Sequence, residues 1–338
     1  MKAIAYRKNR PISHPQALED LKLPCPKIGS ADLLVAIRAV SVNPIDIKTR
    51  QNAPPFEKNT PRVLGFDASG TVIACGEAVK DFSVGDAVYY AGTLNRNGSN
   101  AEYQAVDHQL VAKKPQSLTF AQAASLPLTA ITAYEMLFDR LCITKPLHPE
   151  QTTFLIVGGA GGVGSIALQL ARLHSPLTLI ATASRPDSQA WALKMGAHHT
   201  INHHQPFLPQ LEGLGFSQVD FIFSTSHSDL YLPQYIEALA PQGRLGLIDS
   251  PPSFDISPLK SKSIAIHWEF MFTRSIFACI DKSRQGTILR EIAALIDEGQ
   301  LRSTMRTHFS PINAQNLQKA HALIEGGASI GKIVLENF

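Results

Sequence analysis

The sequence is poor in cysteine, and the thiols that it has are scattered. Its four Cys are Cys25, Cys75, Cys142 and Cys279, and no C-x-x-C pair occurs among them. This pattern excludes a disulfide-dense secreted scaffold and a structural zinc knot, while free thiols are typical of a reducing compartment. We therefore expect a cytoplasmic protein.

Runs of one charge and membrane-spanning segments are also lacking. Lys and Arg number 31 against 28 Asp and Glu, a net charge of +3, and no basic run of the length typical of nucleic-acid patches occurs. The apolar part of residues 1–7 is too short for a signal peptide. The uncharged stretch 152–171 is long enough to cross a bilayer, but its cluster of glycines predicts a buried strand, turn and helix instead. We expect neither nucleic acid nor membrane as a partner.

What is present is enough apolar sequence for two domains, since 338 residues contain 44% hydrophobic residues. Residues 1–115 contain short apolar runs separated by Pro and Gly, the texture of a β-barrel or sandwich. These runs cover residues 33–42, 63–73, 87–91 and 101–106.

The texture changes at Thr119, where Gln122 three residues later gives the spacing of a capping box and predicts a helix from Phe120 towards Asp139, with Pro127 as the place where it could bend. Strands and helices then alternate, which predicts a parallel sheet with helices on both faces. The predicted strands cover 154–157, 177–183, 219–223 and 244–248, and the predicted helices cover 162–173, 189–195 and 230–239. After residue 251 the alternation ends, with helices expected at 287–298 and 313–325. A last strand at 332–335 needs a sheet to join, and we expect it in the amino-terminal domain.

The strongest local motif is the glycine-rich turn Gly159-Ala-Gly161-Gly162-Val163-Gly164. It follows a predicted strand and opens a predicted helix, the context that a dinucleotide fingerprint requires. Small residues let the backbone approach a pyrophosphate, whose charge the helix amides then bind. The alternative is a glycine-rich turn that binds nothing.

The next predicted strand is followed by Ser184 and Arg185, with no Asp or Glu nearby. An acid in this region usually binds the ribose 2′-hydroxyl of NAD, whereas a guanidinium suits a 2′-phosphate. The pair therefore predicts NADPH as the cofactor, unless Arg185 is only a solvated loop residue.

Motifs along most of the chain resemble the medium-chain dehydrogenase/reductase superfamily, in its zinc-free quinone oxidoreductase branch. They are Ser41-Val-Asn43-Pro44-Ile-Asp46, Gly65-Phe66-Asp67-Ala-Ser-Gly70, Phe82-Ser-Val-Gly85-Asp86, Leu126-Pro127-Leu-Thr129 and Gly331-Lys332-Ile-Val-Leu, beside the glycine-rich turn. The block Trp268-Glu-Phe-Met-Phe-Thr-Arg274 looks like a zinc-type alcohol-dehydrogenase-like subgroup of that branch.

The resemblance implies an α/β protein with a GroES-like β-barrel domain and a Rossmann domain that is a doubly wound parallel sheet. The first domain is expected to be discontinuous, with residues 1–122 and 268–338 as the substrate domain and residues 123–267 as the NADPH-binding domain. A homodimer is also expected, paired through the segment around 263–270.

By the same resemblance, zinc dehydrogenases would have ligands where this chain has Asn43 and Phe66, so no metal is expected. Asn43 and Asp46 are the catalytic candidates, and Asp46 is equally well explained as a turn-capping residue. The remaining cofactor candidates lie across both domains. They are Asn43, Thr129, Gly159, Gly161, Gly162, Val163, Gly164, Ser184, Arg185, His203, Ser224, Thr225, Ile248 and Lys332.

His203 stands where relatives often have a Tyr beside the 2′-phosphate. It belongs to two histidine pairs, 198–199 and 203–204, which we interpret as solvated loop residues in preference to a metal site. The aromatic residues Phe66, Trp268, Phe270 and Phe272 are expected either to line a substrate pocket or, for the last three, to form the core face of one strand.

Two functions are compatible with these features. The first is an enzyme in which NADPH delivers hydride to a quinone or an α,β-unsaturated carbonyl compound, acceptors reactive enough to need no zinc. The second is an NADPH-binding sensor or moonlighting protein with little turnover, which is favoured only by the lack of an obvious general acid.

Overall fold

The computed structural model describes residues 1–146, 148, 150 and 152–338. The chain divides into two compact units. Unit 1 comprises Met1–Ile131 and Phe272–Phe338, and unit 2 comprises Thr132–Met271. The sequence predicted the two junctions between the domains after residues 122 and 267. In the structure they lie a few residues later, after residues 131 and 271.

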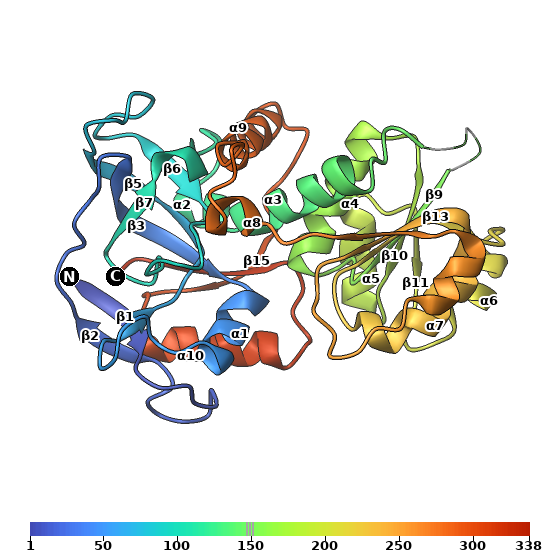
Figure 1. Cartoon of the computed structure of the whole chain (residues 1–338), viewed down its shortest axis with the longest axis horizontal. Coiled ribbons are helices and arrows are strands. Elements are labelled where there is room, and N and C mark those ends of the chain that lie inside the picture. Colours follow the sequence, from blue (N-terminus) through green and yellow to red (C-terminus); the bar gives the residue numbers. More distant parts are fainter. Residues whose placement is uncertain (147, 149, 151) are drawn as a thin grey trace. The chain divides into compact units, whose positions relative to one another are not determined.

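Unit 1 is built mainly from antiparallel strands (Figure 1). One sheet has the order β15-β16-β3-β5-β6-β8, with β7 paired to β3, and a smaller sheet has the order β2-β1-β4. The strands are β1 (Lys2–Tyr6), β2 (Glu19–Lys22), β3 (Asp32–Val42), β4 (Arg62–Val63), β5 (Asp67–Cys75), β6 (Ala87–Tyr90), β7 (Tyr103–Asp107), β8 (Val111–Lys113), β15 (Met305–Phe309) and β16 (Lys332–Glu336). As predicted, the final strand joins the amino-terminal sheet, since β16 runs antiparallel to β3.

The helices of unit 1 include one that the sequence did not predict. Helix α1 (Pro44–Asn52) begins in a region read only as β, although Pro44 stands at its first position and Asp46 at N3 accepts a hydrogen bond from the backbone of the N-cap Asn43. The other helices are η1 (His108–Leu110), α2 (Phe120–Ala124), α8 (Thr273–Ile276), α9 (Arg284–Asp297) and α10 (Ala314–Glu325).

The helix predicted from Phe120 towards Asp139 is present, but at Pro127, where a bend was anticipated, it is interrupted instead of bent. Thr119 and Gln122 form the expected capping box at the start of α2. The chain then re-enters helix at Pro127, as α3 (Pro127–Tyr134), and continues as the π-helix η2 (Glu135–Arg140). Proline has no backbone N–H, but the N–H of a residue in the first turn of a helix has no acceptor within that helix. Pro127 is therefore well suited to start the new helix.

Unit 2 is a six-stranded parallel sheet with helices, as the alternating pattern predicted (Figure 1). Its order is β11-β10-β9-β12-β13-β14, the order of a doubly wound dinucleotide-binding sheet. The strands are β9 (Thr153–Val157), β10 (Thr178–Thr182), β11 (His199–Ile201), β12 (Val219–Ser224), β13 (Leu239–Leu247) and β14 (Ala265–Trp268). The helices are α4 (Gly162–His174), α5 (Pro186–Lys194), α6 (Phe207–Gly213), α7 (Ser228–Ala238) and η3 (Ser257–Lys262).

The core of unit 2 comes from apolar residues on neighbouring strands. Leu155, Ile180, Ile222 and Leu245 are completely buried and belong to one cluster, against which Tyr235 of α7 packs. In such a parallel sheet, ligands bind at the carboxyl ends of the strands where the strand order reverses. Here the order reverses between β9 and β12, so the turn after β9 is the expected place for a cofactor.

Strand β14 lies at one edge of this sheet and coincides with the segment expected to pair two copies of the chain. An edge strand presents unpaired backbone groups that another chain can cover. The homodimer stays a prediction. Within the described residues, no helix combines the length and the apolar character that crossing a bilayer requires.

A buried histidine makes the stability of unit 1 sensitive to acid. His321 on α10 is completely buried, and neither of its ring nitrogens has a hydrogen-bond partner. Burial first, and then the charge of Arg50, lower the pKa of His321 to about 3. The unfolded chain binds a proton near pH 6.5 that the folded chain does not, so folding stability falls as the pH drops below that value.

We expect unit 1 to lose about 1 kcal/mol of unfolding free energy through this residue between pH 6.5 and pH 5.5. His321→Leu should remove that part of the pH dependence and should not destabilise the protein at pH 7, because it also removes two unpaired buried nitrogens. Calorimetric unfolding at the two pH values checks this. An unchanged pH dependence in the variant would contradict it.

Candidate functional site

The glycine-rich turn connects β9 to α4, as the sequence predicted, and its backbone requires glycine. Gly158 has a φ of +78°. A side chain on Gly159 would place a Cβ 2.6 Å from the Cβ of Ala181, and one on Gly164 would come within 2.4 Å of the Gly158 carbonyl oxygen. At Gly159 and Gly164, strand, turn and helix are therefore packed too closely for a side chain, which is the arrangement that lets a pyrophosphate approach the backbone.

The amino terminus of α4 has no side-chain cap. Its N-cap is Gly161, which has no side chain to accept the first amide groups of the helix. Those amides and the helix dipole favour an anion. Two threonine hydroxyl groups hold the turn in place. Thr182 Oγ1 accepts a hydrogen bond from the Gly158 amide at 2.9 Å, and Thr225 Oγ1 donates one to the Val157 carbonyl at 2.8 Å. The sequence had not indicated this role for either residue. Thr225 was expected near the cofactor, but with no stated role.

Arg185 and His203 lie in one electropositive neighbourhood of unit 2. Arg185 is exposed at the start of α5, and His203 follows β11. Burial first, and then the charges of His204, His227 and Arg185, lower the pKa of His203. The His203 and His204 rings lie 4.4 Å apart between centroids. A cluster of this kind suits a phosphate group, and Ser184 directly precedes Arg185.

Two other cofactor candidates are placed differently. The hydroxyl of Ser224 is buried and shared with Ser228 at 2.8 Å and with Tyr235 at 2.7 Å, so this side chain faces the core of unit 2 and not a ligand. Ile248 is partly buried directly after β13. Contacts from the backbone of these residues stay predictions.

The centre of unit 1 is a buried polar cluster around Asp67, which we call the Asp67 cluster: Ser41, Asn43, Asp67, Leu128 and Lys332. One carboxylate oxygen of Asp67, Oδ2, accepts from Ser41 Oγ at 2.7 Å, Asn43 Nδ2 at 2.8 Å and Lys332 Nζ at 3.0 Å. The other, Oδ1, accepts from the amide of Leu128 at 2.7 Å. Both carboxylate oxygens thus accept hydrogen bonds, and one of the four donors is a buried cation.

Lys332 was expected to contact the cofactor, but its ammonium group is committed elsewhere. It also donates to the Val42 carbonyl at 2.9 Å and to Asn43 Oδ1. An ammonium has three N–H donors, so these three acceptors use all of them. The sequence could not reveal this role, because Lys332 and Asp67 are 265 positions apart.

Asp46 supports the same region from α1. It is fully buried and accepts from the Asn43 amide at 2.9 Å and from the Gly65 amide at 3.0 Å. Burial, the largest effect, raises the pKa of Asp46 to about 7, and the nearby charge of Asp67 acts in the same direction. Asp46 therefore acts as the capping residue that the sequence analysis left as one alternative, and it holds the loop that carries Asn43.

Thr129 lies one residue after Leu128 on α3, so the contact between Asp67 and the Leu128 amide fixes its position next to the Asp67 cluster. Thr129 is buried, and its hydroxyl donates to the Leu126 carbonyl at 3.0 Å. The structure therefore brings Asn43, Asp46 and Thr129 together in unit 1.

The three aromatic residues near 270 do not share one strand face, contrary to one of the two expectations. Strand β14 ends at Trp268, and Trp268 and Phe270 are 51% and 45% exposed, whereas Phe272 is buried. The alternation in sequence failed as a guide because the chain leaves the sheet after Trp268. Within unit 1, Phe66 and Phe272 pack edge to face at 5.2 Å. A role of these residues in a substrate pocket stays a prediction.

The residues at the positions that zinc ligands would need do not suit zinc. A catalytic zinc site takes three protein ligands and one open position. Here Asn43 is an amide bonded to Asp67 and Lys332, Phe66 has no donor atom, and Asp67 is already neutralised by an ammonium group. In the part of the chain that the structure describes, no group of three His, Cys, Asp or Glu side chains is arranged to hold a metal ion.

Comparisons with known proteins extend these observations. Residues 29–116 match the family model of the alcohol dehydrogenase GroES-like domain, and residues 195–335 match that of the zinc-binding dehydrogenase. A zinc-type alcohol dehydrogenase-like protein of Staphylococcus epidermidis is 38% identical over 337 residues, which is 99% of each chain.

Two solved structures are similar over the whole chain. One is a Rhizobium etli CFN 42 protein named as a zinc-dependent alcohol dehydrogenase, with a TM-score of 0.97 and 48% identity over 100% of this chain and 98% of that chain. The other is the quinone oxidoreductase of Coxiella burnetii, with a TM-score of 0.81 and 28% identity over 100% and 99% of the two chains.

A GroES-like unit joined to a doubly wound sheet with a glycine-rich turn defines an oxidoreductase that uses a nicotinamide cofactor. The chain belongs to the medium-chain dehydrogenase/reductase superfamily.

Proposed function

We propose that this protein is a zinc-independent reductase that uses NADPH to reduce quinones or α,β-unsaturated carbonyl compounds. The observation that carries the proposal is the ion pair between Lys332 and Asp67, which holds an ammonium group and an amide where a zinc dehydrogenase needs metal ligands. An alcohol needs a Lewis acid or a strong base to release hydride, whereas quinones and enones are already electrophilic. The name of the Coxiella burnetii relative supports the same acceptor class.

Named residues would hold the cofactor. The turn from Gly159 to Gly164 and the first amides of α4 suit the pyrophosphate, and Ser184, Arg185 and His203 suit the 2′-phosphate. Asn43 and Thr129 are proposed to orient the nicotinamide end, and one of the two Asn43 amide hydrogens is already used by Asp67. When bound, NADPH supplies a hydride to the acceptor, and solvent supplies the proton.

Asp46 is proposed as a positioning residue. Its carboxyl group does not reach solvent, and its two hydrogen bonds fix the backbone at Asn43 and Gly65. Both sides of the loop that carries Asn43 are thereby fixed before any substrate arrives, which is the contribution expected of a protein whose cofactor performs the difficult chemistry.

The proposed function predicts turnover without zinc. We expect the dialysed protein to contain far less than about one zinc per chain and to oxidise NADPH in the presence of 9,10-phenanthrenequinone or a simple enone. Elemental analysis and steady-state absorbance of NADPH measure the two quantities. Zinc at about one per chain that resists a chelator would refute zinc independence. Tight NADPH binding with no turnover on either acceptor would favour a binding protein instead.

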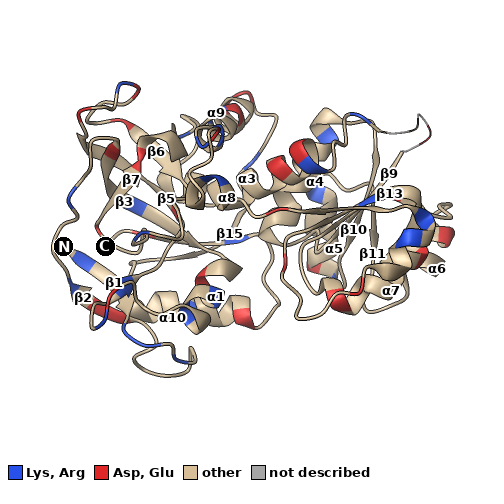
Figure 2. Cartoon of the chain, in the orientation of Figure 1, with Lys and Arg blue, Asp and Glu red and all other residues tan. Residues whose placement is uncertain are grey.

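The distribution of charge supports a small-molecule partner. Figure 2 shows acidic and basic residues interspersed over the elements of each unit. Binding to nucleic acid depends on concentrated basic surface, and the net charge of +3 is small for a chain of this length.

A further inference from the structure

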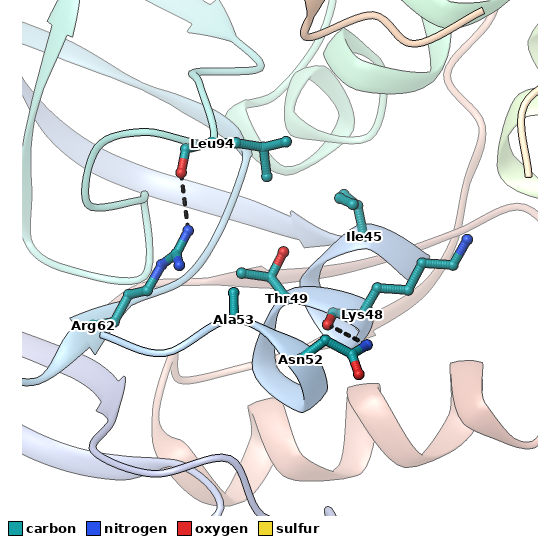
Figure 3. Close-up of a pocket in the computed structure, with 7 residues that line it drawn as sticks. All are labelled: Ile45, Lys48, Thr49, Asn52, Ala53, Arg62 and Leu94. Carbon is teal, nitrogen blue, oxygen red and sulfur yellow. Dashed lines mark hydrogen bonds between the residues drawn. The ribbon is translucent and has the colours of Figure 1, made fainter. Parts of the chain in front are cut away.

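A pocket in unit 1 lies between α1 and the segments that carry Arg62 and Leu94 (Figure 3). Its volume is about 340 Å³. Ile45 and Leu94 supply apolar walls, while Lys48, Asn52 and Arg62 supply the polar groups. The lining contains two cations and no acid.

Arg62 is the unusual member of this lining, because it is a cation that is only 7% exposed. Its guanidinium donates to the Pro54 carbonyl at 3.1 Å and the Leu94 carbonyl at 2.9 Å, and it lies 4.1 Å from the centre of the Phe56 ring. The hydroxyl of Tyr6, an uncharged partner, also interacts with it. A guanidinium has five N–H donors, and carbonyl groups offer only partial charges. Among the described residues, no carboxylate lies within ion-pair distance of Arg62. Buried charges in proteins are normally paired, so this one lacks its counter-charge.

Lys48 adds a second positive charge at the other side of the pocket. Figure 3 shows its side chain leaving α1 on the side away from Arg62, with Thr49 between them. Lys48 is exposed, and it too has no acidic partner within ion-pair distance in the described part of the chain. A ligand that crosses the pocket would thus meet apolar walls between two cations.

The pocket begins close to the residue proposed to orient the nicotinamide end. Asn43 is the N-cap of α1, and Ile45 is in its first turn. A molecule placed along α1 from Asn43 would therefore reach Arg62 within the length of this helix of nine residues.

We propose that this pocket binds the carboxylate of an acidic acceptor, so that the substrate class is an α,β-unsaturated ketone that carries a carboxylate. The inference rests on the proposed function for the reducible group, but not for the anion site. The carboxylate of the ligand pairs with the Arg62 guanidinium and supplies the counter-charge that Arg62 lacks. Ile45 and Leu94 contact the carbon chain, and Lys48 attracts the anion at the rim. A guanidinium matches a carboxylate in shape and charge.

The test compares (E)-10-oxoundec-8-enoate with its methyl ester, two acceptors that share the enone and differ in charge. Six methylene groups separate the carboxylate from the enone, so the molecule is long enough to follow α1, whose nine residues span about 13 Å. Because the ester also differs from the acid in size and solubility, the measurement is the change that a variant causes in the ratio of kcat/KM, acid over ester. We expect Arg62→Gln to lower this ratio about tenfold and Lys48→Gln to lower it about threefold, with Arg62→Lys between Arg62→Gln and the unmodified protein. Lys27→Gln, an exposed lysine in a loop outside the pocket, is the control and should leave the ratio unchanged.

A binding measurement separates this inference from the proposed function. Calorimetric titration with 10-oxoundecanoate, which has the same chain length and no reducible double bond, should show binding that weakens in Lys48→Gln and in high salt. Binding of this kind with no turnover of either enone would overturn the proposed function and keep the anion site. Turnover of both enones with the same ratio in all four variants would overturn the anion site and keep the function. Equal binding of inorganic phosphate would also overturn it, since the site would then be unselective for a carboxylate.

Discussion

Replacing Lys332 by Met should lower the free energy of unfolding of unit 1 by about 3–5 kcal/mol, the usual cost of removing one partner of a buried ion pair. Lys332 and Asp67 are both buried, and the variant leaves the Asp67 carboxylate without its counter-ion. Three donors remain on that carboxylate, from Ser41, Asn43 and the Leu128 amide, so we expect the lower end of the range. The double variant Lys332→Met with Asp67→Asn should recover part of the loss, because no charge is then buried.

The measurement must follow unit 1 by itself. Both tryptophans of the chain, Trp191 and Trp268, belong to unit 2, so intrinsic fluorescence reports on the wrong unit. Native-state hydrogen exchange of the amides in β3 and β16 reports on the correct one. Lys113→Met is the matched control, since its ion pair with Asp86 is exposed on the lysine side and should contribute less than about 1 kcal/mol. Equal losses in the two lysine variants would contradict the buried pair.

The Asp67 cluster also shows where sequence reasoning ends. The glycine-rich turn was predictable because its strand, its glycines and its helix are consecutive, and each local pattern has its own physical cause. The pairing of Lys332 with Asp67 depends on β16 lying beside β3 and on β3 lying beside β5. No local pattern encodes that register, so Lys332 was assigned to the cofactor and Asp67 received no role.

Helix α1 illustrates a different failure, in which the local signal was present but outweighed. Prolines and glycines on both sides favoured a series of short strands, whereas Asn43, Pro44 and Asp46 together had the residues of a helix start. The pocket beside α1 was therefore absent from the sequence interpretation. Arg62 is similar, because an arginine in a short strand gives no sign that it is buried without an acidic partner.

The second large effect concerns cofactor choice, where Arg185→Ala should raise the KM for NADPH about tenfold and leave that for NADH almost unchanged. A charge-assisted hydrogen bond contributes about 1.5–3 kcal/mol, and each 1.4 kcal/mol is a factor of ten. Arg185 is exposed, so we expect the lower end. The substitution keeps the two hydrogen bonds between the Arg185 backbone and the Ser188 hydroxyl at the start of α5, at 3.1 Å and 2.8 Å.

His203 adds a pH dependence to this prediction, because its charge can partly replace that of Arg185. Burial and then neighbouring positive charges, Arg185 among them, lower the pKa of His203, so at pH 7.5 this ring is neutral and Arg185 carries the permanent charge. Removing Arg185 removes one cause of that lowering, so His203 gains a proton more easily as the pH falls. The variant should therefore recover part of its NADPH affinity between pH 7.5 and pH 6, and NADH affinity should not follow. Steady-state KM values for both cofactors at both pH values measure this, with Arg172→Ala at the far end of α4 as the control. Equal losses for NADH and NADPH would place Arg185 against the shared pyrophosphate instead, and equal kcat/KM for the two cofactors in the unmodified protein would remove the 2′-phosphate site from the proposal.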